Sequence, residues 1–395
     1  MKNHQHPFLK VQRIDTSVRQ QNTLSRRGML LSIIGLLAAG CGQETTGFTL
    51  PAGTQTLNPT PPSSLMPNAS HKQSLPPATT SAGKTLLTYK GHTGGVEAVG
   101  WSPDGTRIAS ADSDGGVQVW SASNGKRQNE YHGHTSWVGA LAWSPDSTYI
   151  ATGGSDFRNE KNNTIQVWNA GTGQRLMTYT GHTRSTTGIA WSPDGTHIIS
   201  AGDDGTVQVW EAQSGKRILS LTVMEPNVPI LFALAPDGQH IVAGVNGKIN
   251  GKDQRLVKIY QSQTGDERLT YHDTVSGAEA LSWSPDGKSI AMSQGLGRIP
   301  IWDAANGGDI TNLQAVNSSV LALVWSPDGK YLASGGGSTQ AVEDDNQAQV
   351  WNMASKRVMT YLGHSRPIRA LSWSPDSTRI ASASWDSTVQ IWQAV

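Results

Sequence analysis

The sequence predicts an all-β fold in which one four-stranded unit is used seven times, and three observations lead to this. First, Trp101-Ser102-Pro103-Asp104 recurs five more times, with a degenerate seventh copy at Leu234. Second, successive copies lie 42 to 49 residues apart, which indicates one repeated supersecondary unit. Third, short alternating runs rich in β-branched residues flank each copy and predict strands. Four antiparallel strands repeated seven times predict a seven-bladed β-propeller.

The repeated tetrapeptide is expected to form the turn between the first two strands of each unit. Pro103 presets φ at the second position of a type I turn, and Gly105 relieves strain at the fourth. Two copies carry Ser147 and Ser377 in place of that glycine. We expect those two turns to be slightly weaker but intact.

The two ends of the repeat region are expected to close the ring together. Trp392, which ends the third strand of the last unit, is followed by three residues, too few for a fourth strand. Residues 85–89, just ahead of the first unit, resemble an orphan fourth strand. We predict that this strand pairs with the last blade and so removes a free edge.

Charge is distributed unevenly between the two parts of the chain. Residues 1–84 hold eight of the 31 basic and two of the 30 acidic residues. Residues 85–395 therefore carry 23 basic and 28 acidic residues, a net charge of −5. This mildly acidic propeller region argues against a nucleic-acid partner, and we expect a monomer.

Residues 1–40 have the basic, apolar, small-residue order of an export signal. Arg26 and Arg27 directly precede the apolar run of residues 29–39, an arrangement that resembles a bacterial twin-arginine signal. An ordinary basic export signal with two chance arginines is the alternative. The apolar run is shorter than the ~20 residues that a membrane-spanning helix needs.

Cys41 is the only cysteine and follows Leu36-Leu37-Ala38-Ala39-Gly40. This stretch resembles the cleavage box of bacterial lipoproteins, although Ala38 stands where leucine is more usual. The resemblance implies a lipid attached to Cys41 and a protein anchored at the extracytoplasmic face of a bacterial membrane; the alternative is an inert thiol. Residues 41–84, with many Pro, Ser and Thr residues, are predicted to be a disordered tether to a propeller at 85–395.

Gly-His pairs and strand-ending tryptophans recur in register with the units. Four Gly-His pairs each open a unit, and six tryptophans each close a third strand: Gly91-His92, Gly133-His134, Gly181-His182 and Gly363-His364, with Trp120, Trp168, Trp210, Trp302, Trp351 and Trp392. Over residues 85–395 the sequence resembles the WD-repeat β-propeller family. The resemblance implies a buried hydrogen-bonded network in three blades, made of His92, Ser110, Asp114 and Trp120; His182, Ser200, Asp204 and Trp210; and His364, Ser382, Asp386 and Trp392.

The same Ser, His and Asp residues could be mistaken for the catalytic triads of a hydrolase. Their spacing repeats with the blade, however, which favours a structural role over a single active site. We expect no catalytic, cofactor-binding or metal-binding residues, and a protein that is not an enzyme.

Blades two, four and six carry six or seven extra residues between their second and third strands. We predict three enlarged loops on the rim that carries the Gly-His pairs, where binding residues are often found. Drift in surface turns, or duplication of a two-blade unit, explains the same pattern without function.

The predicted partner-binding rim comprises Trp137, Phe157, Arg158, Arg369 and Trp385. Tryptophan and arginine are common interface hot spots, although local packing on a neighbouring blade is an equal alternative for the two tryptophans. Arg369 shares one first-strand position with Glu97 and Glu279, near the expected channel mouth. The primary hypothesis is a non-enzymatic scaffold that binds a protein or peptide. The alternative is a propeller enzyme or carbohydrate-binding protein that uses the central channel.

Overall fold

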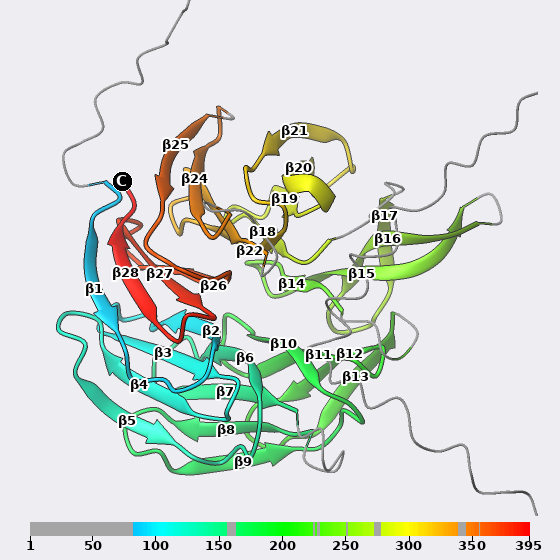
Figure 1. Ribbon diagram of the computed structural model, residues 1–395. Coiled ribbons are helices and arrows are strands. Elements are labelled where there is room, and N and C mark those ends of the chain that lie inside the picture. Colours follow the sequence, from blue (N-terminus) through cyan, green and yellow to red (C-terminus); the bar gives the residue numbers. More distant parts are fainter. Residues whose placement is uncertain are drawn as a thin grey trace, which may run out of the picture. The chain divides into compact units, whose positions relative to one another are not determined.

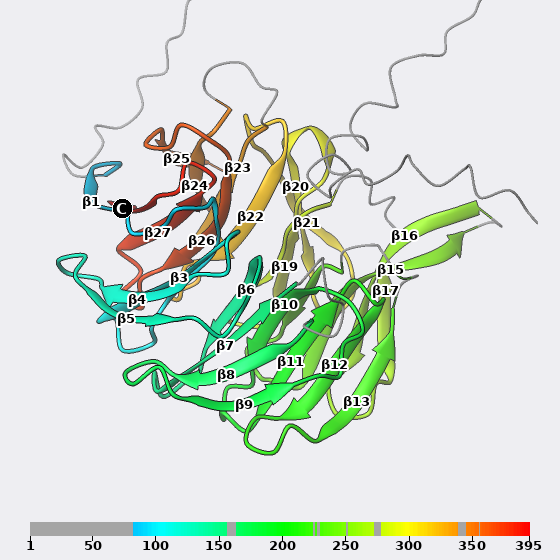
Figure 2. The ribbon, with the colours of Figure 1, turned by 60° about the horizontal axis from the view of Figure 1, so that its bottom comes forward.

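The computed structural model describes residues 82–155, 163–223, 226, 230–249, 252–271, 278–338, 345–354 and 356–395. Within these residues, seven four-stranded antiparallel sheets stand around a common axis, as Figures 1 and 2 show from two sides. The prediction of a seven-bladed β-propeller is therefore confirmed. The predicted export signal, Cys41 and the tether up to residue 81 lie outside the described residues.

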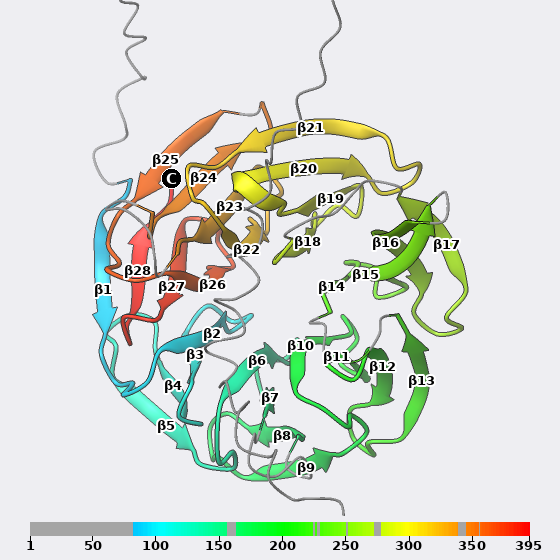
Figure 3. The same ribbon diagram turned by 45° about the vertical axis from the view of Figure 1, so that its right-hand side comes forward.

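In each of the first six blades the strands follow one another in chain order from the axis outward. Figure 3, which faces the ring, shows this order. Blades 1 to 3 comprise β2 (Val96–Trp101), β3 (Arg107–Asp112), β4 (Val117–Ser121), β5 (Arg127–Tyr131), β6 (Val138–Trp143), β7 (Tyr149–Gly154), β8 (Ile165–Asn169), β9 (Arg175–Tyr179), β10 (Thr186–Trp191), β11 (His197–Gly202), β12 (Thr206–Glu211) and β13 (Arg217–Thr222). Blades 4 to 6 comprise β14 (Phe232–Leu234), β15 (His240–Ile249), β16 (Lys252–Gln261), β17 (Glu267–Tyr271), β18 (Leu281–Trp283), β19 (Ser289–Met292), β20 (Arg298–Asp303), β21 (Asp309–Gln314), β22 (Val320–Trp325), β23 (Tyr331–Gly336), β24 (Ala348–Asn352) and β25 (Arg357–Tyr361).

Blade 7 joins the two ends of the ring. It contains β26 (Ile368–Trp373), β27 (Arg379–Ser384) and β28 (Val389–Gln393), and its outermost strand is β1 (Thr85–Tyr89). β1 pairs antiparallel with β28, with Tyr89 opposite Val389 and Thr85 opposite Trp392. The predicted closure is confirmed. Because β1 supplies the missing fourth strand, β28 is not left as an open edge.

The repeated turn has the predicted geometry. The Gly105 N–H donates to the Ser102 carbonyl at 2.9 Å, and Gly105 has a φ of +74°. Ser147 and Ser377 adopt φ values of +59° at the same place, a region that non-glycine residues enter at a cost. Each serine also accepts a hydrogen bond from the neighbouring blade: the Asp104 N–H reaches Ser147 Oγ at 3.0 Å. This contact offsets part of the strain.

The insertion in blade 4 is not the loop that the sequence predicted. β15 and β16 pair continuously from His240–Gln261 to Ile249–Lys252. The extra residues therefore lengthen β15 and β16 into a hairpin of two ten-residue strands, which projects from the sheet in Figure 1. Only two residues separate the paired segments in the sequence, as in the shortest β-hairpins.

The core lies between the blades. The strand-ending tryptophans Trp120, Trp168, Trp210, Trp302 and Trp392 are all among the largest fully buried side chains. A tyrosine from the outer strand of the preceding blade stacks on each of them; Tyr179 and Trp210, for example, have ring centroids 4.3 Å apart. Among the described residues no helix has the length and apolar character needed to cross a bilayer.

Candidate functional site

The predicted network is complete in blade 3, where it connects a loop to two strands. The Trp210 indole N–H donates to Ser200 Oγ at 3.1 Å, and Ser200 Oγ lies 2.8 Å from His182 Nε2. His182 Nδ1 lies 3.0 Å from Asp204 Oδ2. Since the serine accepts from tryptophan, its own proton is available to histidine Nε2, and the other ring nitrogen donates to the carboxylate. The loop before β10 is thereby fixed to β11 and β12.

Blade 7 repeats this arrangement. The Trp392 N–H donates to Ser382 Oγ at 3.0 Å, Ser382 lies 2.7 Å from His364 Nε2, and His364 Nδ1 lies 2.8 Å from Asp386 Oδ2. All members of the network are close enough to be hydrogen-bonded, as a buried polar network requires.

Blade 1 differs in its acid, and the prediction of Asp114 is wrong. His92 Nδ1 lies 2.7 Å from Asp112 Oδ2, whereas the exposed Asp114 accepts from Thr93 and Ser113. The rest of the network matches: His92 Nε2 lies 2.6 Å from Ser110 Oγ, which accepts the Trp120 N–H at 3.1 Å. The reason is the residue at one shared register position. Asp112 pairs with Val96, a position that Gly202 takes in blade 3 and Ser384 in blade 7, so among these three blades only blade 1 has a carboxylate there.

The networks hold serine in a state unsuited to nucleophilic attack. Ser110, Ser200 and Ser382 are fully buried, each with a relative exposure of 0%. Burial acts to raise the pKa of Asp204, but hydrogen bonds from His182, Thr206 and Thr183 outweigh it and hold the pKa at about 2. Asp204 is therefore an ionised hydrogen-bond acceptor at neutral pH, and the arrangement is structural.

A second network was not predicted. In blade 3 the Tyr179 hydroxyl donates to Gln208 Oε1 at 2.6 Å, and Gln208 Nε2 donates to the Gly181 carbonyl at 3.2 Å. Gln118, Gln166 and Gln390 make equivalent contacts in blades 1, 2 and 7. The signal was present in the sequence, because each tyrosine stands two residues before a Gly-His glycine and each glutamine two before the strand-ending tryptophan.

Two predicted rim residues come together near the start of β2 and β26, the innermost strands of blades 1 and 7. Arg369 Nε donates to Glu97 Oε2 at 3.2 Å, and the Trp385 indole N–H donates to Glu97 Oε1 at 3.0 Å. The Arg369 guanidinium carbon also lies 5.0 Å from the centre of the Trp385 ring, a cation–π arrangement. We call Glu97, Arg369 and Trp385 the mouth cluster. It crosses the seam between blades 7 and 1, so Trp385 does pack on a neighbouring blade while remaining half-buried.

The other first-strand positions at this end are occupied differently. Glu279 shares the position of Glu97; burial raises the pKa of Glu279, and the positive charge of Arg369 works against that rise. Gly139 holds the position in blade 2, where the half-buried Trp137 ring covers it: a Cβ at residue 139 would lie 1.9 Å from Trp137 Cη2. Trp137 thus occupies the space that a charged side chain takes in blades 1, 5 and 7.

The remaining rim predictions cannot be placed. Phe157 and Arg158, with the blade 2 insertion, lie outside the described residues, as do residues 339–344 of blade 6. Within the described ranges, no group of three or more His, Cys, Asp or Glu side chains is arranged to hold a metal ion.

A ring of seven sheets with repeated Trp–Ser–His networks defines a repeat-type β-propeller. Four of its blades match WD40 repeats, and the fold is a seven-bladed β-propeller. The family model "WD domain, G-beta repeat" matches residues 83–121, 125–169, 173–211 and 355–393, which are the stretches that end in the tryptophans of blades 1, 2, 3 and 7. A second model, "Eukaryotic translation initiation factor eIF2A", matches residues 246–365 in blades 4 to 6.

Similar curated proteins include several from eukaryotes. They include "Cell division cycle 20.1, cofactor of APC complex" from Arabidopsis thaliana, 28% identical over 34% of this chain and 29% of that protein. The B-type cell cycle switch protein ccs52B from Medicago truncatula is 28% identical over 40% of this chain and 30% of its own. The transcriptional corepressor LEUNIG_HOMOLOG from Arabidopsis thaliana is 27% identical over 35% and 17%. The chain therefore spans less than a third of the length of these relatives.

Proposed function

We propose that the protein is a non-enzymatic scaffold that binds a protein or peptide at the channel mouth. One observation carries this proposal: Arg369 and Trp385, two residue types that dominate interface hot spots, stack on each other and are both held by Glu97. Because their orientation is fixed before a partner arrives, less conformational entropy is lost on binding.

The similar proteins support an interaction role. By their names, one is a cofactor of the APC complex and another is a transcriptional corepressor, so both act together with other macromolecules. The similarity covers about a third of this chain, so the names of these proteins do not identify its partner. The half-buried Trp137, at the same end of blade 2, extends the proposed surface.

The scaffold is proposed to act at the extracytoplasmic face of a bacterial membrane. Support comes from the sequence alone: the Arg26-Arg27 pair, the apolar run of residues 29–39 and Cys41 directly after it. Intact-mass analysis of the mature protein tests this. An N-terminus at Cys41 with an acyl mass increment is expected, and an uncleaved or unmodified chain contradicts the anchor.

Quantitative affinity capture from cell extracts tests the binding surface. Full-length wild-type protein is compared with Arg369→Ala and Trp385→Ala, and with Lys288→Ala as the matched control. Lys288 is exposed in the turn between β18 and β19, at the opposite end of the strands. A specific partner should be recovered at least about tenfold less by the mouth variants, as expected for a hot spot, and normally by the control. Equal recovery of every protein by all four forms, with unchanged melting temperatures, contradicts the proposal.

A further inference from the structure

The repeated turns between the first and second strands contact one another around most of the ring. In blades 1, 3, 4 and 6 a proline of the preceding turn faces the turn glycine, and a Cβ added there would lie 2.7 to 3.8 Å from it. The four pairs are Pro375 with Gly105, Pro145 with Gly195, Pro193 with Gly238 and Pro285 with Gly329. In blades 2 and 7, Ser147 and Ser377 replace the glycine, and their Oγ atoms accept an N–H of the preceding turn at 3.0 and 3.1 Å.

The seam between blades 4 and 5 lacks this contact. Pro236 and Gly287 are the residues that should meet, and both are described. A Cβ added to Gly287, however, would have no atom within 4 Å beyond the adjoining residues. The two turns therefore stand apart at this seam.

A hydrogen bond is missing at the same seam. In blades 2, 3 and 7 the indole N–H of the inner-strand tryptophan donates to a carbonyl of the preceding blade at 3.0 to 3.2 Å. The equivalent acceptor for Trp283 is the carbonyl of Ala233, a described residue, but the Trp283 N–H is buried and does not reach it. Trp325 in blade 6 also lacks its bond, although its seam keeps the turn contact. Among the described residues, the seam between blades 4 and 5 is the one that lacks both.

One side chain of blade 4 covers Trp283 at this seam. The rings of His240, the first residue of β15, and Trp283 have centroids 6.5 Å apart and planes 33° apart. His240 is held within its own blade: Nδ1 lies 3.0 Å from Asp237 Oδ2, and the Arg268 guanidinium donates to Nε2. At the two seams of blade 1, an arginine covers the same tryptophan more closely, with its guanidinium carbon 4.9 or 5.0 Å from the ring centre.

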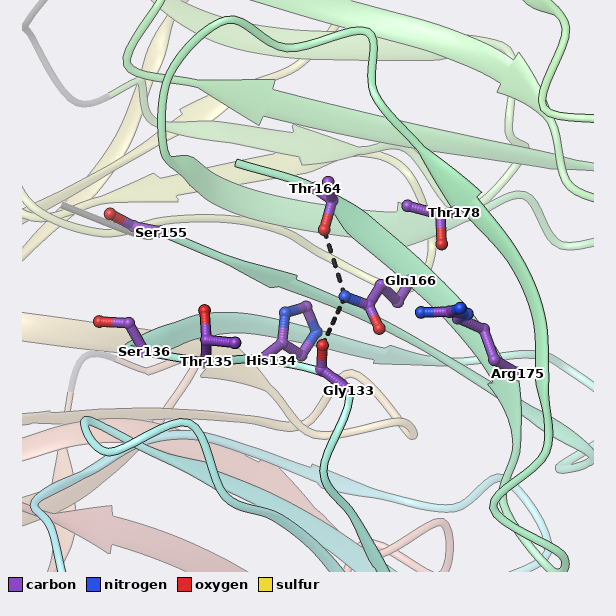
Figure 4. A pocket seen from close by; sticks show the side chains of 9 residues that line it. All are labelled: Gly133, His134, Thr135, Ser136, Ser155, Thr164, Gln166, Arg175 and Thr178. Atoms are coloured by element: carbon purple, nitrogen blue, oxygen red, sulfur yellow. Dashed lines mark hydrogen bonds between the residues drawn. The ribbon is translucent and has the colours of Figure 1, made fainter. Parts of the chain in front are cut away.

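Blades 4 and 5 also lack the glutamine that reinforces blade 2 at its other end. Figure 4 shows Gln166 at a pocket of blade 2, with Nε2 donating to the Gly133 carbonyl at 2.9 Å and to Thr164 Oγ1 at 3.2 Å. Lys258 and Pro300 occupy the same place, two residues before the aromatic residue that ends the third strand. Lysine has no acceptor, and proline has neither donor nor acceptor in its side chain, so neither can replace glutamine.

The contacts that do hold this seam lie in its middle and at its outer edge. Val242, Ile290 and Trp302 are buried in one apolar cluster. The Tyr271 hydroxyl, on the outer strand of blade 4, donates to the Asp303 carbonyl at 2.7 Å. Because the missing contacts belong to the inner strands, an opening here begins at the channel and hinges on the outer edge.

We propose that the ring opens at the seam between blades 4 and 5 while its blades stay intact, and that His240 is the cover that retards this opening. Separation of two blades leaves every strand pair within them unbroken, so it is a smaller event than the unfolding of a blade. The seam between blades 7 and 1, where the chain ends meet, keeps its turn contact, and the Trp101 N–H donates to Ser372 Oγ at 2.9 Å. The mouth cluster spans that other seam, so this proposal and the proposed binding surface can fail separately.

Single cysteines at one repeated position test the ring seam by seam. The third residue of the second strand is at most 1% exposed in every blade and belongs to a cluster shared with the next blade: Ala109, Ala151, Ile199, Val242, Ala291, Ala333 and Ala381. Each is replaced by cysteine in the full-length protein, and the rate of labelling by a thiol reagent is measured under native conditions. Peptide mass spectrometry locates the label, so Cys41 is left in place.

We expect Val242→Cys to be labelled at least about tenfold faster than the other six variants, since one buried hydrogen bond changes an equilibrium by about that factor. Low concentrations of urea should hardly change the rate at Val242→Cys, because a seam opening exposes far less surface than unfolding does. The stability of each variant is measured in parallel, which separates seam opening from a variant that is simply less stable.

A second substitution tests the cover. Added to Val242→Cys, His240→Ala should raise the labelling rate about threefold or more, because an aromatic contact is lost. The same change should leave Ala151→Cys unaffected. His197→Ala is the matched control: His197 is the first residue of β11, as His240 is of β15, and it should not change labelling at Val242→Cys.

Three results overturn the proposal. They are equal labelling at all seven positions, fastest labelling at another seam, and a rate at Val242→Cys that rises with urea in step with global unfolding. An unchanged rate after His240→Ala overturns the role assigned to His240.

Discussion

Blades 3 and 5 each bury the tryptophan that ends their third strand, but the residues around it differ. In blade 3, Trp210 stacks on Tyr179 with a centroid distance of 4.3 Å and an interplanar angle of 5°. In blade 5, Trp302 and Tyr271 are 5.1 Å apart and tilted by 26°. Register places Met292 and Pro300 in blade 5 where blade 3 has Ser200 and Gln208. Both polar networks are therefore lost from blade 5 together.

The difference extends to the inner strands. The Trp191 and Trp373 indole N–H groups donate to backbone carbonyls of the neighbouring blades at 3.2 and 3.1 Å. Those of Trp283 in blade 5 and Trp325 in blade 6 are buried without a partner in the described part of the chain. An unpaired buried donor costs free energy. The ring therefore keeps its shape all the way around while its polar reinforcement is concentrated in blades 7, 1, 2 and 3.

The largest expected effect comes from deleting the buried tryptophan on each side. Trp210→Ala should lower the free energy of unfolding by about 3–5 kcal/mol. Trp302→Ala should cost about 1 kcal/mol less, because no Ser hydroxyl loses a donor and the aromatic stack is poorer. Urea denaturation of both full-length variants measures this. The comparison fails if Trp302→Ala costs as much as Trp210→Ala or more.

Substituting the two acids of blade 1 sharpens the correction made by the structure. Asp112→Asn should cost about 1.5–3 kcal/mol, because Asp112 accepts from His92 and from the Asp114 and Gly116 N–H groups. Asp114→Asn, at an exposed side chain, should change stability by less than about 0.5 kcal/mol. Thermal and urea unfolding provide the measurement, and the reverse order of the two variants would restore the prediction made from the sequence.

A smaller effect should appear as a difference in acid sensitivity. The pKa of Asp204 is about 2 in the folded protein, against about 3.9 in an unfolded chain. The stability that it contributes is present above about pH 4 and is lost as the pH falls from about 4 toward 2. Asp204→Asn should therefore show a shallower loss of stability over this range in stepped-pH urea titrations. An identical slope in both proteins would mean that Asp204 is not linked to folding.

Much of the fold was predictable because it is periodic. The Trp-Ser-Pro-Asp turn, the strand alternation and the orphan strand at residues 85–89 each reflect local chemistry or simple counting. Asp114 was predicted because it follows Ser110 at the spacing of Asp204 and Asp386 from their serines, and the sequence does not show that Asp112 lies within hydrogen-bond distance of His92. The blade 4 hairpin was missed because a run such as residues 246–253, rich in Gly, Asn and Lys, resembles a loop until its backbone finds a partner.

The candidate site was predictable in composition and not in geometry. Arg369 and Trp385 were identified from their positions in the repeat, but their common attachment to Glu97 crosses the seam between the first and last blades.

Hydrogen exchange of the full-length protein, followed by mass spectrometry, tests the central claim most directly. That claim is that polar reinforcement makes blades 7, 1, 2 and 3 the more stable side of one closed ring. Local openings governed by fewer buried hydrogen bonds exchange faster. We predict slow exchange for β26–β28 and β2–β12 and faster exchange for β14–β20. Uniform protection around the ring, or slower exchange in blades 4 and 5, would contradict the account.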